Sequence, residues 1–185
     1  TPQETPVFQF KQLEKFVMYT NAPGVEGKRS SLHWSTYRGN PRISVFTGVP
    51  NDIGKGVINA AMNPETYLIF LDLFEKICLE DRENKYKITC YTILKAKDPT
   101  ENKVREKVHA ADLWFGKDNK GVVWISVTAD NRPKIKFEFK ISDFHQIFKS
   151  DGNAISESEA SSLQALACVK ALRDVIVPHM SDLKA

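Results

Sequence analysis

Apolar and polar residues alternate with a period of two along much of the chain, which predicts β-strands because successive side chains of a strand point to opposite faces. Two such runs, residues 32–37 and 42–47, flank an Arg-Gly-Asn-Pro turn and predict a β-hairpin. A shorter run at residues 15–19 predicts another strand, whereas residues 49–62 are less regular. The second half predicts an antiparallel meander of four strands, at residues 85–95, 104–115, 122–128 and 134–141.

Two long segments carry helical signals. Asn63 offers a cap and Pro64 a first-turn proline for a helix that runs to about residue 80, with an apolar face of Tyr67, Phe70, Leu71, Phe74, Ile77 and Cys78. Ser156 and Glu159 predict a capping box for a final helix, whose apolar face is Leu163, Leu166, Val169, Leu172 and Ile176. Ser142 predicts one extra helical turn through residue 148.

The order of these elements predicts an α+β fold, with antiparallel strand meanders each followed by a long helix in a single domain over residues 1–185. A Pro-basic-Ile-polar-apolar pattern begins at Pro41 and again at Pro133, 92 residues later. The same offset carries Pro64 onto Ser156, so two pseudo-repeats are predicted, about residues 1–84 and 85–185. Chance alignment of two similar patterns is the alternative.

Charge and composition change this picture little. The chain has 26 basic and 23 acidic residues, a formal charge of +3, so any attraction to polyanions must come from the clustering of charge. No apolar run reaches the roughly 18–20 residues of a membrane-spanning helix, and the first residues lack a secretory pattern. These features predict a soluble, cytoplasmic protein, in the host cytoplasm if it is viral.

Motifs for catalysis are absent. Cys78, Cys90 and Cys168 lie far apart in apolar stretches, which predicts buried, reduced thiols. The four histidines have no partners at metal-ligand spacing, and no nucleophile elbow or glycine-rich nucleotide fingerprint occurs. We therefore expect neither an enzyme nor a metal or other cofactor, although an active site assembled from residues distant in sequence would leave no local motif.

The last predicted strand separates its side chains into two faces. Lys134, Lys136 and Lys140 share one face, and apolar residues occupy the alternate positions. In the preceding strand the aliphatic residues point inward, which leaves Trp124 outward beside the lysines. Extending this face to the other strands of the meander adds further candidate contacts: Lys87, Tyr91, Arg105, Lys107 and His109. The turn before the last strand adds Arg132.

The first hairpin predicts a smaller surface of the same kind. If Tyr37 pairs with Arg42 across a four-residue turn, one face holds His33, Ser35, Tyr37, Arg42, Ser44 and Phe46. Trp34 then points into the core with Leu32, Ile43 and Val45. The predicted contacts here are Tyr37, Arg38, Arg42 and Phe46.

Strands followed by a long helix, given twice between about residues 15 and 177, resemble the Whirly proteins and the related transcriptional-coactivator fold, although the lysine-rich strand motif of the Whirly family has no clear match. The chain is also similar to phage-encoded single-stranded-DNA-binding cofactors of RNA polymerase. These resemblances imply sequence-tolerant binding of single strands across sheet surfaces, formation of homo-oligomers and RNA polymerase as a partner.

The functional hypothesis is thus a binding protein for single-stranded nucleic acid, with DNA the first candidate and RNA left open, acting in phage or cellular transcription or replication. Cations hold the backbone and exposed rings stack on bases in such proteins. One alternative is a protein-interaction module, such as an RNA polymerase cofactor that does not itself touch nucleic acid. Another is that the lysines are a solvated face or a protected edge, with Trp124 or Phe46 covered by a subunit interface or a helix.

Overall fold

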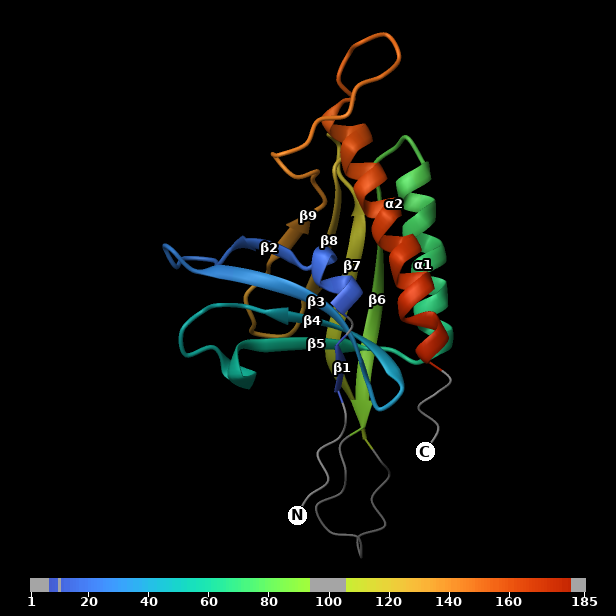
Figure 1. The fold of residues 1–185 in the computed structure, drawn as a ribbon. Helices are drawn as coiled ribbons and strands as arrows, with labels where there is room; N and C mark the ends of the chain where they lie inside the picture. Colours follow the sequence, from blue (N-terminus) through green and yellow to red (C-terminus); the bar gives the residue numbers. More distant parts are fainter. Residues whose placement is uncertain (1–6, 10, 94–105, 181–185) are drawn as a thin grey trace, which may run out of the picture.

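The computed structural model describes residues 7–9, 11–93 and 106–180 and contains two antiparallel sheets and two long helices (Figure 1). The first sheet contains β1 (Val7–Gln9), β2 (Met18–Asn21), β3 (Arg29–Tyr37), β4 (Asn40–Phe46) and β5 (Val57–Ala61). Strands β3, β4 and β5 are neighbours in that order, and β1 and β2 both pair with β3. The fold is therefore α+β, as predicted.

The β3–β4 hairpin turns through two residues. Arg38 and Gly39 both have positive φ, 50° and 80°, which matches the right-handed twist of the flanking strands. Tyr37 consequently pairs with Asn40, and Ser35 pairs with Arg42. The predicted pairing of Tyr37 with Arg42 was wrong by two residues, but a shift of two preserves the alternation, so the predicted faces of the hairpin are confirmed.

The second sheet is a simple meander. Its strands β6 (Asn84–Ile93), β7 (Lys107–Lys117), β8 (Val123–Thr128) and β9 (Lys136–Glu138) pair in chain order, and all pairs are antiparallel. Strand β9 is shorter than the predicted run of residues 134–141. The alternation of that run nevertheless holds, because Ile135, Phe137 and Phe139 are buried while Lys134, Lys136, Glu138 and Lys140 are exposed.

Both long helices begin where their caps predict. Helix α1 (Pro64–Leu79) starts after Asn63, whose side-chain oxygen accepts a hydrogen bond from Thr66 N at 2.8 Å. Its six predicted apolar residues are all buried. Helix α2 (Glu157–Val175) starts after Ser156, and the capping box with Glu159 is present.

The buried face of α2 differs from the predicted one at its N-terminal half. Leu163 is 50% exposed, and the positions that face the core there are Ser161 and Ala165. Small side chains allow a close approach between packed elements. The Ser161 hydroxyl also accepts a hydrogen bond from Val123 N at 2.8 Å, which attaches α2 to β8.

Shorter segments also depart from the predictions. Residues 11–16 form the 3₁₀ helix η1 (Lys11–Phe16) before β2, where a strand from residue 15 was predicted. The irregular segment contains the 3₁₀ turn η2 (Ile53–Gly56) and then β5, and η3 (Val177–His179) follows α2. The helical turn predicted at residues 142–148 is wrong, because the Ser142 hydroxyl accepts a hydrogen bond from Phe144 N, a local turn that competes with a helix.

A single hydrophobic core joins the inner faces of both sheets to both helices. Phe70 and Phe74 of α1 pack against Phe115 of β7, with ring centroids 5.0 and 5.8 Å apart. The three cysteines are buried free thiols, as predicted, and burial raises the pKa of Cys78 to about 12 and that of Cys90 to about 11. Figure 1 shows α1 and α2 on the same side of the second sheet.

A buried ion pair links the two sheets. Arg132, in the turn between β8 and β9, donates to Asp52 through Nε at 3.1 Å and Nη2 at 2.8 Å, and to Val57 O through Nη1 at 3.1 Å. The side chains of Arg132 and Asp52 are 8% and 6% exposed. The guanidinium of Arg132 is thus used within the protein, and the predicted contact of Arg132 with nucleic acid stays a prediction.

Replacing Arg132 with Met should lower the free energy of unfolding by about 3 kcal/mol, since it leaves the Asp52 carboxylate buried without its cation. Urea unfolding followed by circular dichroism measures the change. The matched control is Arg173→Met on α2, where the pair with Asp72 is largely exposed and the loss should stay below about 1 kcal/mol. Equal effects of the two substitutions would contradict a structural role for the Asp52–Arg132 pair.

Candidate nucleic-acid interface

The outer face of the second sheet brings aromatic rings and lysines together. Cross-strand pairing places Lys87, Trp114, Ser126 and Lys136 in one row across β6, β7, β8 and β9. The next row holds Lys85, Gly116, Trp124 and Glu138 in the same strand order. We call this surface the Trp–Lys face, defined by Lys85, Lys87, Tyr91, Lys107, Trp114, Trp124, Lys134 and Lys136.

The ammonium groups lie over the indole rings. Lys85 Nζ and Lys87 Nζ are 5.7 and 5.2 Å from the ring centroid of Trp114, and Lys136 Nζ is 5.1 Å from that of Trp124. These distances are within the range of cation–π attraction. The lysines are exposed and both tryptophans are half-buried, so each ring is held in place by neighbours and still offers part of its surface to a ligand.

A β-bulge extends the face toward the other end of the sheet. The register shifts between Cys90 and Tyr91, so that Tyr91 pairs with His109 whereas Cys90 pairs with Ala111. Tyr91 is 53% exposed, and Lys107 Nζ lies 3.9 Å from its ring centroid. The outward positions of β7 are therefore odd-numbered before the bulge and even-numbered after it.

This bulge explains what the sequence reasoning missed. Strict alternation from Lys107 and His109 assigns Trp114 to the inner face, but the extra residue turns it outward, where Lys85 and Lys87 meet it. Of the candidates predicted in this half, the structure brings Lys87, Tyr91, Lys107, Trp124, Lys134 and Lys136 onto one face. Arg105 lies outside the described residues.

The Trp–Lys face is hollowed beside the turn between β8 and β9. A depression of about 690 Å³ is lined by Trp114, Trp124, Lys134 and Lys136, among others. Its polar lining includes the Ser126 and Thr128 side chains, and Thr128 accepts a hydrogen bond from Trp114 Nε1 at 3.2 Å. Both long helices pack on the opposite side of the sheet, so neither covers this hollow.

Acidic residues border the face and pair locally. Lys136 lies 4.0 Å from Asp118, and Glu138 pairs with Lys140 at 3.1 Å. Such exposed pairs hold their lysines weakly in water. The lysines of the Trp–Lys face therefore stay available to a phosphate backbone.

His109 is held between two carboxylates at the rim of the hollow. Its Nε2 lies 3.1 Å from Asp112 Oδ1 and its Nδ1 lies 3.3 Å from Asp130 Oδ2. The hydrogen bonds that the ring N–H groups donate to Asp112, the larger effect, and to Asp130 favour the charged imidazolium and raise the pKa of His109 above its ordinary value of 6.5. The bond to Asp130 ties β7 to the turn that follows β8.

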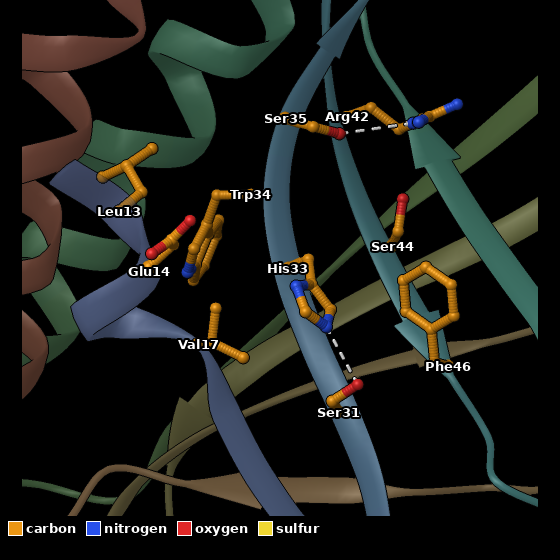
Figure 2. Close-up of a pocket in the computed structure, with 10 residues that line it drawn as sticks. All are labelled: Leu13, Glu14, Val17, Ser31, His33, Trp34, Ser35, Arg42, Ser44 and Phe46. Carbon is orange, nitrogen blue, oxygen red and sulfur yellow. Dashed lines mark hydrogen bonds between the residues drawn. The ribbon is translucent and has the colours of Figure 1, made fainter. Parts of the chain in front are cut away.

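The predicted contacts of the first hairpin gather on a separate surface. Arg42 lies 5.1 Å and Arg38 lies 5.5 Å from the ring centroid of Tyr37, on the outer face of the first sheet. Phe46 is 43% exposed and meets the His33 ring edge-to-face at 5.0 Å. Trp34 is buried, as predicted, and donates to Phe16 O at 3.1 Å. Figure 2 shows His33, Arg42 and Phe46 around a pocket in this region.

Comparison with protein-family models, with curated proteins and with solved structures finds no match for this chain. The resemblance to the Whirly proteins and the internal duplication therefore stay predictions. Within the described residues, no helix has the length and apolar character needed to cross a membrane. In the same part of the chain, no cluster of three or more His, Cys, Asp or Glu side chains is arranged to hold a metal ion.

Because two carboxylates lie beside His109, we expect its ring to titrate above the ordinary pKa of histidine. The stabilisation they give is fully present below pH 6.5 and is lost as the pH rises through the raised pKa of the folded protein. An NMR titration of the His109 ring should give that raised pKa, and Asp112→Asn or Asp130→Asn should lower it. Asp151→Asn, in a distant loop, is the control and should leave the titration unchanged; a fall with this variant as well would contradict the assignment.

Proposed function

We propose that this protein binds single-stranded nucleic acid on the Trp–Lys face, with DNA as the first candidate and with little sequence preference. The observation that carries the proposal is the packing of Lys85, Lys87 and Lys136 over the half-exposed rings of Trp114 and Trp124. Single-strand-binding surfaces combine these two elements, because cations follow the phosphates while rings stack on unpaired bases.

The geometry of the face supports single strands over duplexes. Trp114 and Trp124 are diagonal neighbours on adjacent strands, a spacing of about 7–8 Å in a regular antiparallel pair. A single strand can place successive bases against such a pair of rings, whereas the bases of a duplex are already stacked on one another. Tyr91, with Lys107 over its ring, offers a third stacking position farther along the sheet.

The same surface supports low sequence preference. Stacking tolerates any base, because every base has a π-face, and lysines contact phosphates regardless of sequence. A role in transcription or replication, with RNA polymerase as partner and with homo-oligomers, rests on the resemblance given by the order of elements.

A second candidate function is a protein-interaction module, and a different surface supports it. The loop between β9 and α2 exposes Phe144 at 92%, Phe148 at 59% and Ile147 at 46%. Figure 1 shows this loop at the end of the molecule where α2 begins. Exposed aromatic residues of this kind anchor protein interfaces.

Replacing Lys87 and Lys136 together with Gln should weaken binding to single strands of every sequence and reduce the salt dependence of affinity. The two lost phosphate contacts should flatten the slope of log K against log salt by about 1.4. Fluorescence anisotropy with labelled oligonucleotides at several salt concentrations measures the slope. Lys76→Gln with Lys170→Gln, on the helices, is the matched control and should leave affinity and slope unchanged.

Replacing Trp114 or Trp124 with Leu should weaken binding by about 1–3 kcal/mol each and leave the salt slope as it is, because stacking releases no counterions. Phe144→Leu is the control for loss of an exposed ring away from the face. Wild-type protein that ignores both single and double strands at low salt would overturn the proposed function and make the protein-interaction module the leading candidate.

A further inference from the structure

A second pocket lies in the first sheet, apart from the Trp–Lys face. Its volume is about 410 Å³, which is within the range of small-molecule sites, roughly 300–1,000 Å³. It is built from η1 and from the adjacent, paired strands β3 and β4, whose lining side chains Figure 2 shows. Its lining residues are Leu13, Glu14, Val17, Ser31, His33, Trp34, Ser35, Arg42, Ser44 and Phe46.

The pocket has a wall suited to a flat ring. Phe46 of β4 is 43% exposed, and its ring is fixed by an edge-to-face contact with His33. His33 is itself held by a hydrogen bond between its Nε2 and the Ser31 hydroxyl at 2.9 Å. On the η1 side, Val17 is half-buried, whereas Leu13 and Trp34 are buried beneath the pocket wall. A planar heterocycle can lie against the exposed part of the Phe46 ring.

One end of the pocket carries an uncompensated cation. Arg42 is half-buried, and among the residues that the structure describes no carboxylate lies within 4.0 Å of its guanidinium. Its Nε donates to the Ser35 hydroxyl at 3.4 Å, and its guanidinium packs over the Tyr37 ring. Burial lowers the pKa of Arg42, as expected for a partly desolvated cation without an anion. The remaining donors of the guanidinium fork match a phosphate.

The other end carries a carboxylate. Glu14 comes from η1, which packs beside β3 on the edge opposite to β4, so β3 separates Glu14 from Arg42 (Figure 2). In the described part of the chain no cation lies within 4.0 Å of the Glu14 carboxylate. A carboxylate accepts hydrogen bonds only, and the exocyclic amino group of cytosine, adenine or guanine is the donor it would select on a base.

From this arrangement we propose that the pocket binds a nucleoside monophosphate whose base bears an exocyclic amino group, either as a free nucleotide or as the phosphorylated end of a strand. Arg42 and the hydroxyl of Ser35 donate to the phosphate, Phe46 receives the face of the base, and Glu14 accepts from the amino group. The inference does not depend on the function proposed for the Trp–Lys face, because the two surfaces share no residues.

Three small probes test the two ends of the pocket separately. Isothermal titration should show that cytidine monophosphate binds about tenfold or more tightly than cytidine, which lacks the phosphate, and more tightly than uridine monophosphate, which lacks the amino group. In the wild-type protein, the amide NMR signals shifted by cytidine monophosphate should be those of Ser31, His33 and Phe46. Failure of cytidine monophosphate to bind, or shifts confined to the Trp–Lys face, would overturn the proposal.

Variants assign the roles of the two charged residues. Arg42→Met should bring the affinity for cytidine monophosphate down to that for cytidine, and Glu14→Gln should abolish the preference for the cytidine over the uridine nucleotide. The matched controls are Arg82→Met and Glu26→Gln, exposed residues outside the pocket, which should change neither ratio. Retention of both ratios in Arg42→Met and Glu14→Gln would likewise overturn the proposal. If a variant does not fold, the NMR mapping on the wild-type protein still tests where cytidine monophosphate binds.

Oligonucleotides distinguish the free nucleotide from the strand end. A short single strand beginning with dC is compared with and without a 5′-phosphate, so that any contribution of the Trp–Lys face is common to both. Tighter binding of the phosphorylated strand, lost in Arg42→Met, identifies a strand end as the ligand. Equal binding of both strands, with cytidine monophosphate still bound, identifies the free nucleotide.

Discussion

Burial of only one side of the β6–β9 sheet is the constraint on which the rest of the structure depends. Both long helices pack on that side, where Phe70 and Phe74 meet Phe115. Strand alternation then places every second side chain on the opposite side, away from the helices. An exposed side of a sheet is usually polar, yet this one carries two half-buried tryptophans with lysine ammonium groups over their rings. These half-exposed rings beside cations are the basis of the function proposed for the Trp–Lys face.

The two candidate surfaces differ in their charge and shape, and the difference suits different ligands. The Trp–Lys face is long, open and dominated by lysines, which suits a polymer with repeated phosphates. The pocket of the first sheet is small and has a cation at one side and a carboxylate at the other, which suits a single polar molecule. Arg132 bonds Asp52 and the backbone of Val57 in β5, so it links the first sheet to the turn that borders the Trp–Lys face.

Much of the fold follows from local patterns. The caps at Asn63 and Ser156, the apolar face of α1 and the alternation around Lys136 could all be predicted, because each depends on neighbours within a few residues. The outward position of Trp124 could be predicted for the same reason. Even the wrong hairpin register gave the right faces, since strand parity survives a shift of two residues. Local rules did not show that Ser142 would form a turn in place of a helix.

The sequence by itself determined the α+β class, the two capped helices and the lysine-bearing face of the last strand, because these arise from the period of polar and apolar residues. Only the tertiary structure decided that Trp114 lies beside Lys87, that Arg132 pairs with Asp52, and that Glu14 and Arg42 line one pocket. The physical reason is distance along the chain. A bulge depends on how two strands pair, and an ion pair across 80 residues depends on how two sheets pack, so neither leaves a periodic signal in the sequence.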